Sequence, residues 1–255
     1  PPETLRITAL GDSFVFGWGV PFQTTFGQVL ARNDASIQVI NFGVPGYGVD
    51  QIYLAYREKA KAYNADIVVI GIFPEDFWRA SRSFTDAGHA KPYFVLNAMS
   101  QELILKNVPV PPPYTLTKDQ FPRIVHYSGI EGILVKSRVY SLLKRGIMRL
   151  GKLVDWVDPD TSEEMILGRA ILHNLIDDIR RDGAKPILMI VPPKRWFYRA
   201  TPESIHLSLI RFSKQAHVLL LDLTQAFKKR FEDEPIEDYY LSGDDHWSEK
   251  GHELV

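Results

Sequence analysis

The sequence predicts a three-layer α/β/α domain whose central sheet has five mostly parallel strands. Strand and helix patterns alternate along most of the 255 residues. Three strand candidates contain unbroken apolar cores, at 67–70, 187–191 and 218–221. Because continuous rather than alternating hydrophobicity indicates that both faces of a strand are covered, these strands are expected in a parallel sheet flanked by helices.

Five short apolar runs are the expected strands of this sheet. In chain order they are Leu5–Leu10, Ile37–Asn41, Asp66–Gly71, Lys185–Val191 and Val218–Asp222. The expected helices lie between them, at about Gln23–Arg32, Asp50–Tyr63, Ser162–Arg181 and Pro202–Gln215. A stop signal, Asp182-Gly183, follows the third helix, and the turn Pro45–Gly48 separates the second strand from the helix after it.

Residues of about 79–160 interrupt this alternation, and we interpret them as an insertion into a single domain that spans 1–255. The proline-rich segment Val108–Pro113 predicts an extended loop. A helix is expected at about 131–153, with apolar residues on one face and three arginines on the other: Arg138, Arg145 and Arg149. This basic face is either solvated where the helix packs on the domain, or it contacts an anionic membrane surface or polysaccharide.

Composition and charge exclude several classes of function. The formal net charge is −1, so no global field favours nucleic acid as a partner. The chain has no cysteine, which excludes disulfides, thiolate nucleophiles and cysteine-ligated metals. The longest apolar run, 65–73, is far shorter than the roughly 20 residues that span a bilayer. The chain begins almost at its first strand and stops inside an expected helix, so we expect an excised domain whose flanking segments carried any targeting signal.

The first strand ends in the block Gly11–Phe14 (Gly-Asp-Ser-Phe), which places the hydroxyl of Ser13 at the edge of the sheet. One interpretation is a simple turn, because glycine tolerates unusual backbone angles and Asp and Ser form local hydrogen bonds. The other is a catalytic serine. Near the far end of the chain, His246 could supply a base, and Asp244 or Asp245 could supply the carboxylate that orients it.

Four suggestive segments fall at the carboxyl ends of the expected strands. Ser13 follows the first strand, residues 43–48 follow the second, and residues 74–76 follow the third. Asp244 and His246 lie in a loop just before the last helix. Because ligand sites in open parallel sheets form beyond the carboxyl ends of the strands, we expect these segments to converge on one site.

Three blocks of this sequence together resemble the SGNH (GDSL-type) hydrolase superfamily. They are Gly11–Phe14, Asn41–Gly48, and Asp244–Trp247 with Gly251-His252. The resemblance covers most of the chain outside the 79–160 region. It implies the flavodoxin-like α/β/α architecture of that superfamily and no cofactor.

By this resemblance Ser13 is the nucleophile, His246 is the general base, and Asp244 is the carboxylate that orients the base. The backbone N–H groups of Ser13 and Gly46 line an oxyanion hole. The chemistry requires these residue types, because a serine hydroxyl is a weak nucleophile until an imidazole accepts its proton. A carboxylate must also hold that imidazole in the right tautomer. Asp245 is the alternative to Asp244 for this role.

Glu75 and Asp12 complete the predicted oxyanion and substrate-binding residues, and Glu75 departs from the pattern of the superfamily. The third block reads Gly71–Asp76 (GIFPED), so Glu75 stands where the superfamily has an asparagine that donates to the oxyanion. An ionised carboxylate has no proton to donate, and its charge opposes a developing oxyanion. Protonation through burial, a turn away from the site, or pairing with Arg79 or Arg82 would relieve this conflict.

The resemblance implies a serine hydrolase that removes acyl groups, most simply acetyl, from the oxygen atoms of a carbohydrate or lipid. A variant is transfer of the acyl group to a hydroxyl of a surface polysaccharide. A different class is a non-catalytic carbohydrate-binding domain, which Glu75 favours and which would use nearby aromatic residues: Trp18, Tyr47, Phe77, Trp78 and Trp247. Relatives of this architecture imply an extracytoplasmic location, either periplasmic or tethered to a membrane.

The remaining histidines are considered either as metal ligands or as structural residues. A metal site is an alternative for the C-terminal cluster, with the ligands Asp244, Asp245, His246 and His252. His173 and His206 fall within expected helices, where a surface or packing role is the default.

Overall fold

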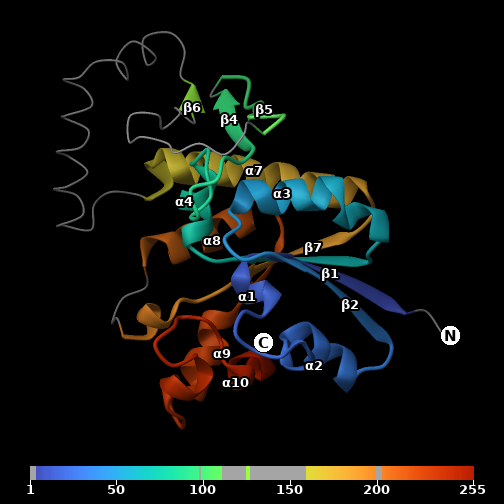
Figure 1. The fold of residues 1–255 in the computed structure, drawn as a ribbon, viewed down its shortest axis with the longest axis vertical. Coiled ribbons are helices and arrows are strands. Elements are labelled where there is room, and N and C mark those ends of the chain that lie inside the picture. The colour runs from blue at the N-terminus through green and yellow to red at the C-terminus, as the bar shows by residue number, and fades with distance from the viewer. Residues whose placement is uncertain (1–3, 98, 111–124, 127–158, 199–202) are drawn as a thin grey trace.

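The computed structural model describes residues 4–97, 99–110, 125–126, 159–198 and 203–255, and Figure 1 shows their arrangement. Five parallel strands form the central sheet in the order β2-β1-β3-β7-β8. Their bounds are β1 Leu5–Gly11, β2 Ile37–Gly43, β3 Ile67–Ile72, β7 Lys185–Ile190 and β8 Leu219–Asp222. The predicted α/β/α fold class is confirmed, and each expected strand is present with bounds that differ by one or two residues.

The register of the sheet brings the carboxyl ends of its central strands to one edge. Gly11, the last residue of β1, is paired with Gly43, the last residue of β2. On the other side of β1, Leu10 is paired with Ile70 of β3, and both side chains are fully buried. The loops that follow β1, β2 and β3 therefore start beside one another.

Helices cover both faces of the sheet (Figure 1). One face is covered by α3 Val49–Glu58, α4 Glu75–Ala80, α7 Glu163–Arg181 and α8 Ser204–Gln215. The other face is covered by α1 Ser13–Phe16, α2 Phe26–Asn33, α9 Leu223–Arg230 and α10 Glu249–Leu254. The core is accordingly divided into two clusters of buried apolar side chains, one on each side of the strands.

Two of the expected helices are shorter than predicted, because a residue with a non-helical backbone interrupts each. The helix expected at 23–32 is a 3₁₀ turn, η1 Phe22–Thr24, followed by α2, and Thr25 between them is extended. The helix expected at 50–63 ends at Glu58, and the 3₁₀ turn η2 Ala60–Tyr63 follows the non-helical Lys59. Three further 3₁₀ turns are η4 Pro159–Thr161, η5 Lys194–Tyr198 and η6 Ile236–Tyr239.

The interrupting segment contains strands that the sequence patterns did not predict. A small sheet of order β5-β4-β6 is formed by β4 Tyr93–Asn97, β5 Leu103–Lys106 and β6 Val125–His126. It packs on the main domain, since Phe94 and Leu96 are buried in the core cluster that contains α7. The predicted basic helix, with Arg138, Arg145 and Arg149, lies outside the described residues. No helix in the described ranges is long and apolar enough to cross a membrane.

Candidate active site

Ser13 lies at the point where β1 turns into α1. Asp12 is the N-cap of α1, and its Oδ1 accepts a hydrogen bond from the Phe14 N–H at 3.0 Å. Gly11 allows α1 to pack directly against the strand, because a Cβ atom there would lie 2.3 Å from Cγ2 of Val15. The Gly-Asp-Ser segment therefore joins the last residue of β1 to the first residue of α1. It presents Ser13 at the carboxyl edge of the sheet.

The structure brings together the three residues named from the sequence as a triad. The Ser13 Oγ atom lies 2.7 Å from Nε2 of His246, and Nδ1 of His246 lies 2.5 Å from Oδ1 of Asp244. The same carboxylate oxygen accepts from the backbone N–H of His246 at 3.0 Å. A carboxylate only accepts, so Nδ1 carries the proton and Nε2 is left to accept from the serine hydroxyl. Asp245 is exposed and takes no part in this chain of bonds.

The environment of Asp244 favours its ionised form. Desolvation acts to raise the pKa of this carboxyl, but the hydrogen bonds from the backbone and ring of His246 outweigh it and hold the pKa below its usual value. The imidazole itself lies between two aromatic rings, with Phe14 at 4.8 Å and Trp18 at 6.4 Å between ring centroids. Phe14 is buried, whereas Trp18 is half exposed.

Two backbone N–H groups near Ser13 form a candidate oxyanion hole. The loop that carries Gly46 is held to the end of β1, because the Val44 N–H donates to the carbonyl of Gly11 at 3.1 Å. Gly46 has a φ of 78°, which favours glycine, and open space surrounds its Cα atom. Within the described chain, the N–H groups of Ser13 and Gly46 form no hydrogen bond. Both are free to bind a substrate oxygen.

Comparison with known proteins identifies the fold. No protein-family model and no curated protein matches the sequence. Among solved structures, a protein described as lipolytic and of the G-D-S-L family, from Desulfitobacterium hafniense DCB-2, matches with a TM-score of 0.52 and 13% identity over 98% of this chain and 94% of its own. A catalytic mutant of Axe2, an acetylxylan esterase from Geobacillus stearothermophilus, matches with a TM-score of 0.54 and 15% identity over 99% and 90%. The acetyl xylan esterase AlAXEase matches with a TM-score of 0.54 and 12% identity over 98% and 95%. The chain has the SGNH hydrolase fold.

Asp12, which precedes Ser13, is buried rather than exposed in an open site. Its carboxylate is buried, and Oδ2 accepts from Arg79 at 3.1 Å. The same guanidinium binds the buried Asp76 at 2.8 Å and Asp86 at 3.2 Å. Desolvation raises the pKa of Asp12 and, together with the charge of Asp12, raises that of Asp76 further. The Asp12 carboxylate therefore binds other groups of the protein. Through this contact Arg79, which belongs to α4, links that helix to the turn that carries Ser13.

Glu75 begins α4, and its cation partner differs from those expected. Oε1 of Glu75 lies 3.0 Å from a guanidinium nitrogen of Arg195, which belongs to η5 after β7. The expected partners are engaged elsewhere, Arg79 in the network above and Arg82 with Asp86. The second carboxylate oxygen of Glu75 is buried and has no partner among the described residues. The position that holds a donating asparagine in the superfamily thus holds an ion-paired carboxylate, and sequence reasoning did not identify Arg195 as its partner.

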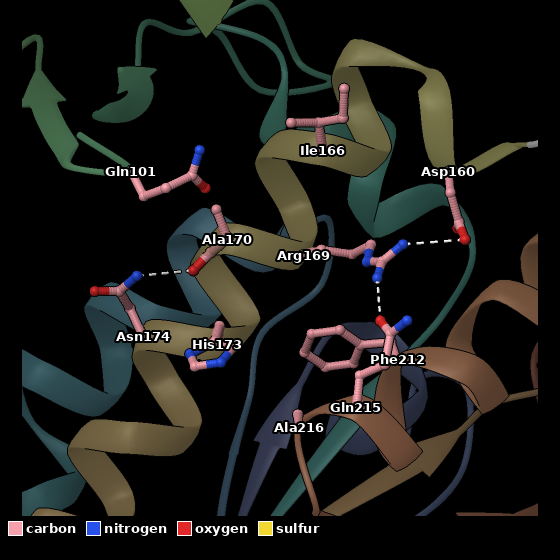
Figure 2. A pocket seen from close by; sticks show the side chains of 10 residues that line it. All are labelled: Gln101, Asp160, Ile166, Arg169, Ala170, His173, Asn174, Phe212, Gln215 and Ala216. Carbon is pink, nitrogen blue, oxygen red and sulfur yellow. Dashed lines mark hydrogen bonds and ion pairs between the residues drawn. The ribbon is translucent and has the colours of Figure 1, made fainter. Parts of the chain in front are cut away.

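Among the hollows in the described part of the molecule, two of the larger ones lie at different distances from the candidate triad. One, of about 530 Å³, lies beside the triad and is lined by Lys194, Gly243, Asp244 and Asp245. The other, of about 470 Å³, lies between α7 and α8 (Figure 2). There Arg169 reaches toward Asp160 and Gln215, and Asn174 donates to the carbonyl of Ala170. The hollow that Asp244 lines is the one that adjoins the candidate triad.

The four proposed metal ligands do not assemble into a cation site. His252 is buried, and its Nδ1 accepts from the Phe26 N–H at 3.3 Å. Asp244 and His246 bind each other, and Asp245 faces solvent. Among the described residues, no group of three or more His, Asp or Glu side chains is arranged to hold a metal ion.

Proposed function

We propose that this protein is a serine-dependent ester hydrolase that removes acyl groups, most simply acetyl, from oxygen atoms of a carbohydrate or lipid. The observation that carries the proposal is the continuous chain of hydrogen bonds from Asp244 through His246 to Ser13. Similar solved structures include acetylxylan esterases and a protein described as lipolytic. Their activities support an ester as the substrate.

The geometry supports a two-step acyl-enzyme mechanism. In the first step Ser13 Oγ attacks the ester carbonyl carbon while Nε2 of His246 accepts the hydroxyl proton. The C–O bond to the alcohol then breaks, and His246 returns that proton to the leaving oxygen. In the second step a water molecule gives a proton to His246 and attacks the acyl-enzyme, which releases the carboxylic acid and restores Ser13. Asp244 stays ionised throughout and stabilises the imidazolium form of His246.

The oxyanion that forms in each step is bound by backbone donors. The N–H groups of Ser13 and Gly46 supply two hydrogen bonds, and Glu75 supplies none in its ionised form. Loss of one oxyanion donor costs about 3 kcal/mol in other enzymes, which slows turnover without abolishing it. The ion pair with Arg195 offsets the negative charge of Glu75, so the carboxylate opposes the oxyanion less than an unpaired one would.

A fluorophosphonate probe tests the proposal because it reacts covalently with activated serines. We expect the wild type and the Ser36→Ala control to be labelled and to hydrolyse an acetyl ester. Ser36 is an exposed serine that precedes β2 at the opposite edge of the sheet. We expect Ser13→Ala to lose both properties while it keeps its melting temperature. A folded wild type that neither reacts with the probe nor hydrolyses any ester of a broad panel would contradict the proposal.

A second candidate function is carbohydrate binding without catalysis, and Glu75 is the observation that favours it. In this case the ion-paired carboxylate belongs to an oxyanion hole that no longer stabilises the oxyanion formed when a serine attacks an ester. The same labelling experiment separates the two candidates, since a binding domain would bind sugars but leave the probe unreacted. Measurable turnover that depends on Ser13 would exclude the binding-only function.

A further inference from the structure

We infer that the alcohol half of the substrate is a sugar ring, which stacks on Trp18 and directs its hydroxyl groups toward Lys194 and Asp245. The inference rests on the proposed hydrolase function and assigns a substrate class to the same site. Its basis is the position of Trp18 and of the polar hollow relative to His246.

The mechanism determines on which side of the site the alcohol lies. His246 must protonate the leaving oxygen, so that oxygen lies next to Nε2 when the C–O bond breaks. The carbonyl oxygen instead points to the backbone N–H groups of Ser13 and Gly46. The alcohol therefore extends toward the groups that surround the imidazole, and these groups select among substrates that carry the same acyl group.

Trp18 is the apolar surface on that side. Its side chain is 49% exposed, and its ring centroid lies 6.4 Å from that of His246 at an interplanar angle of 43°. Single exposed apolar residues are common on proteins, but this one is tied to the nucleophile. Its backbone N–H donates to the carbonyl of Ser13 at 3.0 Å. An indole held in this way offers a large flat face at little entropic cost, which suits the C–H face of a pyranose.

The loop that carries Trp18 is also fixed against the segment before His246. Gly17 and Gly19 on either side of Trp18 have φ angles of 86° and 82°, which few other residues adopt. A Cβ atom on Gly19 would lie 2.4 Å from Cδ1 of Leu241, so the absence of a side chain permits this close packing. The loop that carries Trp18 is therefore packed against the segment that leads to His246.

The hollow beside the triad has the polarity that hydroxyl groups require. Its lining residues are Lys194, Gly243, Asp244 and Asp245, none of which carries an apolar side chain. Asp244 is bound to His246, whereas the charged groups of Lys194 and Asp245 form no ion pair within the described ranges. The Lys194 ammonium lies 5.8 Å from the centre of the Tyr240 ring, which leaves its donors available. A donor and an acceptor facing one hollow match the hydroxyl groups of a sugar better than a hydrocarbon chain.

The test compares acetyl esters that differ only in their alcohol. The substrates are mono-O-acetylated methyl pyranosides of glucose, mannose and xylose, with ethyl acetate and glycerol triacetate as non-sugar esters. We expect the wild type to prefer at least one pyranoside in kcat/KM. We expect Trp18→Ala to lower the ratio of kcat/KM for that pyranoside to kcat/KM for ethyl acetate about tenfold, mainly through a higher KM. Trp18→Phe should recover most of the ratio because it restores an aromatic face.

Two further variants examine the hollow, and a matched aromatic variant serves as the control. Lys194→Met and Asp245→Asn are each expected to lower the same ratio about fivefold, since each removes one hydrogen-bonding charge. Tyr63→Ala removes an aromatic side chain of similar exposure, 47%, from η2 before β3, at the opposite edge of the sheet. It should leave the ratio at the wild-type value.

Several outcomes would overturn the inference while the hydrolase proposal stands. One is a wild type that hydrolyses ethyl acetate or glycerol triacetate as well as every pyranoside. Another is a Trp18→Ala variant that loses activity equally on all esters, which would mean that Trp18 only supports His246. If no ester is hydrolysed, the proposed function itself fails. Calorimetric titration of Ser13→Ala with the acetylated pyranosides then decides the inference, since binding that Trp18→Ala weakens about tenfold supports it and absent binding refutes it.

Discussion

Among the described residues, two groups of an aspartate, a histidine and a hydroxyl residue differ in the order of their hydrogen bonds. In the first, Asp244 binds Nδ1 of His246 and Ser13 binds Nε2. In the second, Asp222 Oδ2 lies 2.8 Å from Nε2 of His206, and the Thr224 hydroxyl lies 3.5 Å from the same nitrogen. Only the first arrangement lets the ring accept a hydroxyl proton at one nitrogen while the carboxylate holds the proton on the other, because its two partners occupy opposite nitrogens.

The two groups also differ in access to solvent. The side chain of His246 is 23% exposed, whereas that of His206 is 6% exposed and lies against the ring of Trp196. Asp222 caps α9 by accepting from the Thr224 N–H at 3.0 Å, so this group ties α8 to the junction of β8 and α9. Similar residue types therefore form a partly exposed group, for which we propose catalysis, and a buried group that serves packing. The two groups are distinguished by the order of their hydrogen bonds and by the solvent exposure of the histidine.

The largest expected effect separates the two aspartates. Asp244→Asn should lower kcat about 10⁴-fold, because an amide no longer selects the tautomer that accepts from Ser13. Asp222→Asn should leave kcat within about twofold and lower the free energy of unfolding by about 1–3 kcal/mol, since it weakens a helix cap and a buried hydrogen bond. Turnover of one acetyl ester and urea unfolding of both variants measure these effects. Comparable losses of kcat in the two variants would refute the division of roles.

A third histidine, His252, extends the comparison because no carboxylate among the described residues binds it. Desolvation, with a smaller contribution from the charge of His246, lowers the pKa of His252 to about 4 from its ordinary value of 6.5. The unfolded chain binds a proton at this residue below about pH 6.5, and the folded chain does so only near pH 4. The stability contribution is therefore fully present above about pH 6.5 and is lost as the pH falls toward 4, on the order of 3 kcal/mol in total.

Urea unfolding between about pH 7 and about pH 4 checks this effect. His252→Gln should be less stable than the wild type at neutral pH, and this difference should shrink as the pH falls. The control His173→Gln should follow the wild-type pH dependence, since the His173 side chain is 58% exposed. Parallel curves for His252→Gln and the wild type would show that His252 is not buried in its neutral form.

The smallest expected effect concerns the hydroxyl of the second group. Thr224→Val keeps the shape of the side chain and the backbone N–H that Asp222 caps, and it removes the hydroxyl that lies 3.5 Å from His206 and also hydrogen-bonds the Asp222 carboxylate. We expect a loss of about 0.5–1 kcal/mol in the free energy of unfolding and unchanged kcat. A tenfold loss of turnover on an acetyl ester would show that this hydroxyl contributes to the chemistry.

Local sequence patterns predicted the main sheet and named the candidate triad, for physical reasons that lie within short segments. A strand covered on both faces needs a continuous apolar run, and 67–70 and 187–191 are such runs. The block that contains Ser13 and the pair Asp244 and His246 are short enough to be read as motifs. The small sheet was missed because its strands lie in the segment that interrupts the strand–helix alternation, although residues 93–96 of β4 form an apolar run. The split of the expected helix at Lys59 was missed because no breaker residue marks it.

The sequence by itself determined where the five strands of the main sheet lie, where several of the covering helices lie, and which residues stand at the carboxyl ends of these strands. Only the tertiary structure decided how those residues bind one another. Contacts between loops from different strands decide three features of the site. They select Asp244 over Asp245 as the partner of His246, they pair Glu75 with Arg195, and they bury Asp12 against Arg79. Hydrogen bonds and ion pairs act over a few ångströms, so residues far apart in the chain acquire partners only when the sheet brings their loops together.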